Sequence, residues 1–410
     1  MNTLDLLVKR LGSQRSSFKT MGELGEFYGG VSGKSKEDFT EGNAPLITYM
    51  NVFANIEVQA DVSSRVRISE NEKQNNVQFG DVLFTGSSET LYECGMSSVM
   101  TTKTEKKIYL NSFCFGYRFY DSGLFLPSFT KYLFRSEGIR EQIIKTASGV
   151  TRFNVSKKKM ACVRIPIPPL EVQQQIVYEL DNFTFCTKKL TEKLTTELAV
   201  RGKQFEYYRG ELLDFDNKET PTTLLREIVD FRNGKGHEKD IDENGKYIVV
   251  NSKYISTGGE VKKFTSKQIC PLYKDDILMV MSDLPNGRAL AKCFLVDQDD
   301  KYSLNQRIGA FHIKSPAVRT RFLFHVLNRN RQLLAYDNGV DQTNLKKEEI
   351  LDIKIYIPSL DVQDRLVSML DQFDSTYNDL SNSLSVEIEA RWKQYEFYRD
   401  SLLRFKELTA

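Results

Sequence analysis

The sequence predicts an α/β, more narrowly α+β, fold with a pseudo-two-fold repeat. Two mixed globular domains alternate with two long helices that pair as an antiparallel coiled coil. The first observation behind this prediction is a stretch that occurs twice, Ile165–Leu213 and Ile355–Leu403, with 190 positions between matched residues and no gap. The second is that both copies carry apolar residues at helical spacing. The third is that short strand-like runs precede each copy, so the repeated unit is a domain plus a helix.

Each copy indicates one long helix. Proline residues precede both (I-P-I-P-P and I-Y-I-P-S), as suits a first turn whose N–H groups have no partner within the helix. Some 43 helical residues would span roughly 65 Å, and a small domain cannot bury a helix of that length. The other copy is the simplest partner for an a/d seam of this kind. In the first copy the seam residues are Ile176, Leu180, Phe183, Leu190, Leu194, Leu198, Phe205, Tyr208 and Leu212.

Composition is that of an ordinary soluble globular chain, with 40% hydrophobic and 27% charged residues. The net charge is only +2, so contact with nucleic acid would have to be local. The six cysteines show no C-x-x-C spacing and there are three histidines, which suggests neither a zinc site nor disulfides. No apolar run is of membrane-spanning length, and Met1–Lys19 does not resemble a signal peptide. We expect a reduced, cytoplasmic protein without membrane contact.

The chain divides into four predicted parts: a first domain over 1–168, a helix over 169–213, a second domain over 214–357 that follows a linker at 214–223, and a helix over 358–410. Residues 1–17 hold a short amphipathic piece and a polar connector. Strand-like runs in the first domain include P-L-I-T-Y-M-N-V-F and S-F-C-F-G-Y-R-F, and one helical segment is expected from Pro127 to about Ala147. The second domain repeats the pattern, with a helix expected from about Ala317 to Tyr336.

The two domains correspond in order, though weakly in sequence. L-G-E-F-Y-G-G (from Leu24) parallels L-R-E-I-V-D-F (from Leu225), and G-D-V-L-F (from Gly80) parallels D-D-I-L-M (from Asp275). The same 190-residue offset that relates the two helices also relates two segments before them. These are S-G-V-T-R-F-N (from Ser148) and N-G-V-D-Q-T-N (from Asn338). The two domains keep the same order of segments but differ in sequence. This pattern predicts two binding sites with the same function and different targets.

Catalytic motifs are absent from the sequence. G-G-V-S-G-K-S (Gly29–Ser35) lacks the glycine spacing of a phosphate-binding loop and is not followed by a helical pattern. I-P-P-L (Ile167–Leu170) lacks the amide and aromatic residues of an amino-methyltransferase motif. Loose D…E-x-K matches arise by chance in a chain this rich in charge, and His237, His312 and His325 have no partner at metal-ligand spacing. We therefore predict neither enzymatic activity nor a metal site.

Polar loop residues at corresponding points of the two domains remain as candidates. Arginine and lysine suit guanine edges, asparagine and glutamine suit adenine, and all of them can hold phosphates. Each residue alone could equally be a solvated loop residue, but the matching sets favour DNA binding. The candidates are Tyr49, Asn51, Ser87, Ser88, Arg152, Asn154, Asn251, Ser252, Lys253, Asn286, Arg288, Gln306, Arg307 and Gln342.

Three sets of motifs resemble one known family, the specificity (S) subunits of Type I restriction–modification systems. They are I-P-I-P-P-L-E-V-Q-Q-Q-I with I-Y-I-P-S-L-D-V-Q-D-R-L, the G-V-T-R-F-N and G-V-D-Q-T-N segments, and the helix ends K-Q-F-E-Y-Y-R and K-Q-Y-E-F-Y-R. The resemblance covers essentially the whole chain. One departure is Ser359, which replaces the second proline of the motif in the second copy.

The resemblance implies that each domain is a target recognition domain reading one half of a bipartite site in double-stranded DNA. The two conserved helices would set the gap and dock methyltransferase (M) subunits, normally two, to which restriction (R) subunits attach. The chain itself would bind no cofactor, while the partner subunits would use S-adenosylmethionine, ATP and Mg. The alternatives are a non-catalytic coiled-coil scaffold and an orphan DNA-binding protein without a restriction partner. A single-chain enzyme is disfavoured because its S-adenosylmethionine motifs are missing.

Overall fold

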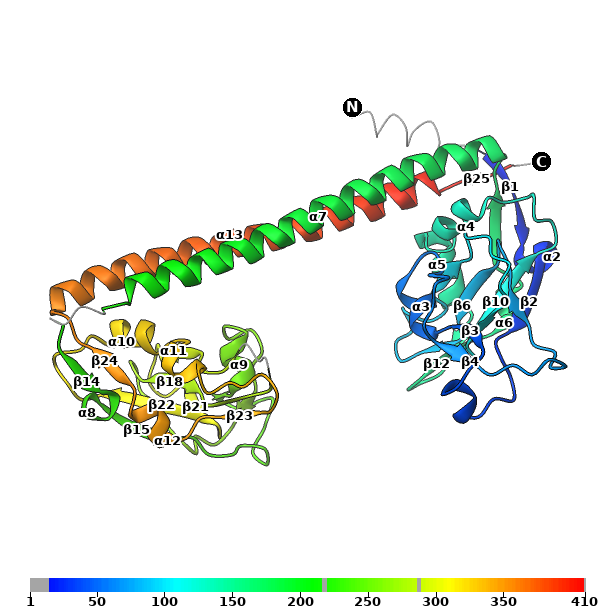
Figure 1. Cartoon of the computed structure of the whole chain (residues 1–410). Coiled ribbons are helices and arrows are strands. Elements are labelled where there is room, and N and C mark those ends of the chain that lie inside the picture. Colours follow the sequence, from blue (N-terminus) through cyan, green and yellow to red (C-terminus); the bar gives the residue numbers. More distant parts are fainter. Residues whose placement is uncertain (1–14, 216–219, 286–288, 409–410) are drawn as a thin grey trace. The chain divides into compact units, whose positions relative to one another are not determined.

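The computed structural model describes residues 15–215, 220–285 and 289–408 (Figure 1). Its contacts divide the chain into two compact units, which we describe separately. The first unit holds residues 1–195 together with 385–410, and the second holds 196–384. The second unit is therefore inserted into the first. The predicted amphipathic piece before residue 15 lies outside the described residues, and the four predicted domain boundaries stay a prediction.

The first unit is built on a four-stranded antiparallel sheet of order β2-β10-β6-β8 and a second sheet of order β4-β3-β9-β5. Smaller sheets of order β11-β12-β7 and β13-β1-β25 complete it. The strands are β1 (Arg15–Thr20), β2 (Gly25–Gly29), β3 (Ala44–Ile47), β4 (Arg65–Val66), β5 (Asn76–Val77), β6 (Val82–Thr85), β7 (Ser87–Ser88), β8 (Ser97–Val99), β9 (Ile108–Leu110), β10 (Cys114–Phe119), β11 (Ala147–Ser148), β12 (Phe153–Val155), β13 (Arg164–Ile167) and β25 (Lys406–Glu407). The short helices are α2 (Met21–Leu24), α3 (Tyr49–Ala54), α4 (Pro127–Leu133), α5 (Glu137–Ile144) and α6 (Lys157–Met160), with a 3₁₀ turn at Glu37–Phe39.

The second unit repeats this plan. Its main sheet has the order β15-β22-β18-β20, and β17-β16-β21, β14-β24 and β19-β23 form the smaller sheets. The strands are β14 (Thr222–Leu224), β15 (Val229–Asn233), β16 (Tyr247–Val250), β17 (Phe264–Thr265), β18 (Ile277–Val280), β19 (Ser282–Asp283), β20 (Cys293–Leu295), β21 (Tyr302–Leu304), β22 (Ile308–Ile313), β23 (Thr343–Asn344) and β24 (Lys354–Tyr356). The short helices are α8 (Leu225–Ile228), α9 (Ser252–Ser256), α10 (Thr320–Leu327), α11 (Arg331–Leu334) and α12 (Lys347–Leu351).

A buried aspartate holds the main sheet of each unit together. Asp81 is 1% exposed, and it accepts hydrogen bonds from Arg118 (2.6 Å) and the Tyr28 hydroxyl (2.6 Å). Its counterpart Asp276 is fully buried and accepts from Arg232 at 2.7 Å. A buried carboxylate is tolerated only when it is paired and hydrogen-bonded in this way. These aspartates therefore belong to the structural frame of the two sheets.

The predicted correspondence at the start of each domain is shifted by three residues. Gly25 pairs with Phe119 in the first unit and Val229 pairs with Ile313 in the second, so Met21, and not Leu24, is the counterpart of Leu225. The error arose because the sequences that start at Leu24 and at Leu225 both begin L-x-E. The pairing of Gly80 with Asp275 agrees with the structure, since both take positive φ (89° and 70°) immediately before the buried aspartate.

Two expected helices are each broken in two. Ser136 adopts extended backbone (φ −69°, ψ 150°), so the segment expected from Pro127 to Ala147 forms α4 and α5. Asn330 likewise separates α10 from α11, and its side chain accepts a hydrogen bond from the Gln332 N–H. The run Pro45–Phe53 is a strand followed by a helix, because the Thr48 side chain accepts from the Asn51 N–H and caps α3.

The two long helices, α7 (Leu170–Leu212) and α13 (Leu360–Leu402), lie side by side and run antiparallel (Figure 1). In the first unit Phe183 stacks on Tyr398 with ring centroids 5.3 Å apart. In the second unit Phe205 stacks on Tyr377 at 5.1 Å. The predicted seam is fully buried where a domain covers it, as at Ile176 and Leu180, while Leu190 is 37% exposed. Two helices alone cannot bury every seam residue.

One buried glutamine anchors the start of each long helix. The Gln173 amide oxygen accepts from the Leu126 N–H at 2.9 Å, and its nitrogen donates to the carbonyls of Leu124 (3.0 Å) and Pro168 (2.9 Å). Gln363 makes the same three bonds in the second unit, to the Arg319 N–H and to the carbonyls of Ala317 and Pro358. Both side chains are fully buried. The V-Q pair of the repeated motif is therefore a structural clamp.

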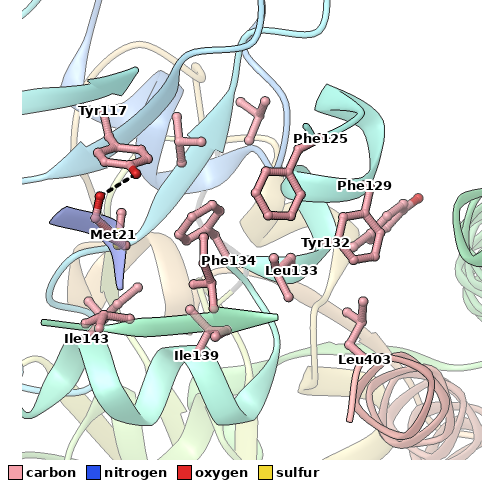
Figure 2. Close-up of a cluster of buried hydrophobic side chains, with 14 of the residues drawn as sticks. Met21, Tyr117, Phe125, Phe129, Tyr132, Leu133, Phe134, Ile139, Ile143 and Leu403 are labelled. Carbon is pink, nitrogen blue, oxygen red and sulfur yellow. Dashed lines mark hydrogen bonds between the residues drawn. The ribbon is translucent and has the colours of Figure 1, made fainter. Parts of the chain in front are cut away.

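The core of the first unit includes the end of the chain (Figure 2). Leu403 faces the aromatic cluster around Phe129 and Tyr132, and Leu402 and Phe405 belong to the same core. β25 then pairs in parallel with β1, Arg15 opposite Lys406. The second helix thus ends at Leu402 rather than continuing to 410, because the following residues complete a sheet and a core.

Candidate nucleic-acid interface

A polar hairpin edge is the main candidate surface in the first unit. β11 and β12 form a hairpin whose turn holds Gly149 (φ 148°) and Arg152, and β12 pairs on its other side with β7. Arg152 and Asn154 are exposed, and the Arg152 guanidinium has no hydrogen bond or ion pair with any residue that the structure describes. An unpaired arginine on a hairpin can contact a phosphate or a guanine edge.

Ser87 and Ser88 lie under this edge, with their side chains buried. The Tyr49 hydroxyl donates to the Ser87 carbonyl at 2.9 Å, and burial raises the pKa of Tyr49. Asn51 is occupied as well, since its side chain exchanges two hydrogen bonds with the backbone of Gln59. Tyr49, Ser87 and Ser88 therefore support the edge from behind. A base-reading role for these three residues and for Asn51 stays a prediction.

The second unit carries the same edge in the same register. Asn154 lies opposite Ser87 in the first unit, and Asn344 lies opposite Ser282 in the second. Gln342, the counterpart of Arg152, is exposed and donates to the Ser282 hydroxyl at 2.8 Å. An amide at this point can offer both a donor and an acceptor to a base edge.

Arg307 lies beside this second edge. Its backbone carbonyl accepts from the N–H of Met281, which precedes β19, and its exposed side chain has no partner in the described parts of the chain. Arg307 takes a positive φ of 66°, which is uncommon for a residue other than glycine. Gln306, next to it, is held by a hydrogen bond to Glu238 at 2.5 Å.

The remaining candidates of the second unit belong to α9 or cannot be placed. Asn251 caps α9 by accepting from the Tyr254 N–H at 2.9 Å, whereas Ser252 and Lys253 are exposed on the same helix. Between described residues, no hydrogen bond or ion pair links α9 to the β19–β23 edge. The α9 residues and the edge residues are therefore treated as two separate candidate surfaces. Asn286 and Arg288 lie outside the described residues.

A lysine run that the candidate set missed follows the first edge directly. Lys157, Lys158 and Lys159 are exposed on α6, immediately after β12. Lys347 holds the corresponding place on α12 in the second unit. Three successive lysines were visible in the sequence, but a charge run of that length is usually only a solvated face. Their position beside the hairpin makes them candidates for phosphate contacts.

The glycine-rich stretch Gly29–Ser35 also has a structural explanation. A side chain at Gly30 would lie 2.1 Å from the Asn111 carbonyl oxygen, so glycine is needed there for close packing. Lys34 is paired with Glu72 at 2.6 Å, which holds the pKa of that carboxyl at about 2. Because Lys34 is already ion-paired with Glu72, it does not serve as the lysine of a phosphate-binding loop.

His325 has acidic partners that its sequence spacing did not reveal. Its Nε2 lies 2.8 Å from Asp371 and its Nδ1 lies 3.8 Å from Asp374, both on α13. One possible ligand atom from each of the three residues lies within 4.8 Å of the other two, which is close enough to hold a metal ion. Arg321, however, donates to both oxygens of Asp371 at 2.9 and 3.2 Å, so the carboxylate is already neutralised. Burial lowers the pKa of His325 and raises that of Asp374. We interpret the cluster as a hydrogen-bonded network in which Arg321 forms the ion pair with Asp371.

The fold and its two edges define a class of protein, a duplicated chain that presents two similar loop edges on domains joined by paired helices. The chain belongs to the family of the Type I restriction modification DNA specificity domain, whose family model matches residues 15–199 and 217–390. The two matches cover both repeats. Among the described residues, no helix is both long and apolar enough to cross a membrane.

Two relatives are specificity subunits. The chain is 31% identical over 274 residues to the Type I restriction enzyme EcoR124I/EcoR124II specificity subunit of Escherichia coli, covering 62% of this chain and 64% of that one. It is 27% identical over 271 residues to the Type I restriction enzyme MjaVIII specificity subunit of Methanocaldococcus jannaschii, covering 60% and 63%. The matches thus span less than two thirds of the length of these relatives.

Solved structures share the fold. One is a chain from a study of complex assembly and conformational transition of the type I R-M system, with a TM-score of 0.73, 14% identity, and coverage of 94% of this chain and 97% of that one. Another is the HsdS subunit of Thermoanaerobacter tengcongensis, with a TM-score of 0.52, 14% identity and coverage of 94% and 96%. They support two domains and paired long helices in this chain.

Proposed function

We propose that this chain is the sequence-reading subunit of a Type I restriction–modification complex. Each domain reads one half of a bipartite site in double-stranded DNA, and the paired helices set the gap and dock methyltransferase subunits, two per chain. The observation that carries the proposal is the double match of the specificity-domain family, once in each repeat. The exposed Arg152–Asn154 and Gln342–Asn344 edges, in one register, support it.

The chemistry of modification and cleavage belongs, in this proposal, to the partner subunits. The methyltransferase subunits would use S-adenosylmethionine, and restriction subunits, where present, would use ATP and Mg. This chain contributes binding and orientation in the cytoplasm. Its buried aspartates are paired within the frame, as at Asp81 and Asp276, and so are unavailable as general bases.

Divergence between the two edges is what two different half-sites require. The frame of each edge is the same, with an asparagine opposite a serine, whereas the residue two positions earlier is arginine in one unit and glutamine in the other. Arginine pairs bidentately with guanine and glutamine with adenine, at about 1–3 kcal/mol of discrimination for each good pair. The two units would therefore prefer different bases at equivalent places.

The test is selection of duplexes from a randomised library by the full chain together with its methyltransferase partner. We expect two short fixed half-sites separated by a gap of constant length. Arg152→Ala should relax one half and leave the other unchanged. Enrichment of a single continuous site, or of none, would contradict the proposal. The purified chain alone should neither methylate nor cut the selected duplex, and turnover by it would assign chemistry to this chain after all.

A further inference from the structure

A recess in the second unit lies where α7 ends against the α10–α11 connection and β24. Its volume is about 530 Å³. Five basic side chains line it, Lys203, Arg209, Arg329, Arg331 and Lys354. The acidic residues of the lining are Glu206 and Asp214. The wall of the recess is therefore strongly electropositive, although the whole chain is nearly neutral.

The basic groups are of two kinds. Arg209 is 7% exposed and fixed, because its Nη2 donates to the carbonyls of His325 and Asn328. Lys203, Arg331 and Lys354 are exposed, and their side chains make no hydrogen bond or ion pair with the residues that the structure describes. Arg209 is offset by Glu206 at 3.8 Å, and Arg329 donates to the Leu290 carbonyl at 3.1 Å. The three unpaired cations therefore leave a positive potential that an anion would neutralise.

Gly210 makes room for one of these cations. A Cβ at Gly210 would lie 2.4 Å from Nη2 of Arg331, so the guanidinium lies against the backbone of α7. Any other residue at 210 would displace it. The position of Arg331 in the recess thus depends on a glycine in the last turn of α7.

The equivalent recess of the first unit has the opposite charge. It holds about 320 Å³ and is lined by the acidic residues Glu137, Glu141 and Asp400 and the basic residue Arg404. Asp400 stands at the repeat position of Gly210, 190 residues later, and Glu141 stands at that of Arg331. Asp400 accepts a hydrogen bond from the Glu137 N–H at 2.9 Å, pairs with Arg399 at 2.9 Å and so fills the space.

The frame around the two recesses is nevertheless the same. Gln332 donates to the Lys354 carbonyl (2.9 Å) and accepts from the Lys354 N–H (3.1 Å), and Gln142 makes the same pair of bonds with Arg164 (3.1 and 3.0 Å). Since this pairing is repeated, the residues at 210 and 331, against those at 400 and 141, are a marked difference between the two recesses. One member of the pair can attract an anion and the other cannot.

We propose that the recess of the second unit binds a phosphate-bearing ligand. Arginine forks match phosphate oxygens, and the lysine ammonium groups add charge around them. The exposed ring of Tyr207 (58% exposed) borders the recess and offers a flat apolar face beside the phosphate position. The phosphate can come from a free polyphosphate or nucleotide, or from a DNA backbone. The site is separate from the hairpin edges and does not depend on the proposed function.

The probe is inorganic pyrophosphate, titrated into the full chain by calorimetry at constant ionic strength without DNA. We expect one saturable site. Arg331→Glu and, independently, Gly210→Asp reproduce the residues of the other recess, and each should weaken binding about tenfold or more. Glu141→Ala, in the first-unit recess, is the matched control and should leave binding unchanged. Lys203→Gln, on an exposed helix face, tests the site if the other two variants fold poorly.

Absence of saturable binding, equal binding by Arg331→Glu, or equal loss in Glu141→Ala would overturn the proposal. A second arm distinguishes the sources of phosphate. If a random duplex displaces pyrophosphate, and Arg331→Glu lowers the salt slope of duplex binding by about 1, the ligand is a DNA backbone. If ATP displaces pyrophosphate and duplex does not, the ligand is a free nucleotide.

Discussion

At the scale of single residues, the repeat shows how one position carries different chemistry in two settings. In the first unit the Tyr132 hydroxyl donates to Asp181 at 2.5 Å and lies 3.3 Å from Thr184. In the second unit His325 occupies the matching place beside Asp371 and Asp374. Asp371 and Asp374 stand 190 residues after Asp181 and Thr184. A group that titrates near neutrality thus replaces one that does not.

This difference makes the stability of the second unit depend on pH. Because burial lowers the pKa of His325, the folded state keeps the imidazole neutral while the unfolded chain takes up a proton below about pH 6.5. The unfolded state then binds more protons, so stability falls as pH drops through that value, by at most about 1.4 kcal/mol per pH unit. The raised pKa of Asp374 acts in the opposite direction at more acidic pH.

His325→Tyr, which copies the first unit, and His325→Gln should flatten this dependence. The measurement is the urea midpoint of the second unit between about pH 7.5 and 5.5. Gln372→Ala, at an exposed residue of the same helix as Asp371, is the control and should keep the slope. An unchanged slope in both His325 variants would mean that another group is responsible.

Lys253 tests whether the α9 surface reads DNA. If it contacts a base, Lys253→Ala should relax the second half-site alone, at a cost of about 1–3 kcal/mol for the bases concerned. Lys193→Ala, an exposed lysine of the same type on α7, should change neither half. Duplex selection gives both results. Uniform weakening of all sequences would show that Lys253 grips a phosphate instead.

Which side chains face solvent was the least predictable feature of the candidate site. The sequence located the hairpin edges, since G-V-T-R-F-N and G-V-D-Q-T-N lie in register. It could not show that Ser87 and Ser88 are buried or that Asn51 is tied to Gln59. Exposure depends on strand pairing between distant segments, and short-range patterns do not encode it.

At the scale of elements, the glutamine clamp fixes each long helix to its domain. Gln363→Ala would leave the Arg319 N–H and the carbonyls of Ala317 and Pro358 without their partner in a buried place. We expect a loss of at least about 2 kcal/mol in the free energy of unfolding of the second unit. Gln372→Ala removes the same side chain from an exposed site on the same helix and should cost under about 0.5 kcal/mol. Equal losses would show that the clamp has no special role.

The long helices were the most predictable elements and the short ones the least. A proline before the helix and a seam of regular spacing mark α7 and α13 over many turns. The breaks at Ser136 and Asn330 rest on single residues inside otherwise helical patterns. The strand β25 carries no pattern of its own and forms because β1 offers it an unpaired edge.

At the scale of the whole molecule, the proposed spacing role of the helices can be tested by lengthening them. Adding one heptad to both α7 and α13 keeps each seam residue on its face and adds a rise of about 10 Å. That rise corresponds to roughly three base pairs. Those base pairs also turn the second half-site by about 100°, so the preferred gap should lengthen while affinity falls.

The measurement is selection from a library of duplexes with randomised gap length. A heptad added to one helix alone should break the pairing of Phe183 with Tyr398 or of Phe205 with Tyr377, and with it the fold. A doubly extended protein that folds, binds and still prefers the original gap would show that the helices do not set the distance.

The order in which a ribosome makes this chain has a consequence for its first unit. Phe405, Leu403 and β25 are part of that unit, yet they are synthesised only after the whole of the inserted second unit. At about 5–20 residues per second, the stretch from 196 to the end takes roughly 10–40 seconds to emerge. During that time the aromatic cluster around Phe129 lacks its cover, whereas the second unit has all its residues as soon as residue 384 is made. The half of the protein that is made first therefore cannot complete its core until the other half has been made.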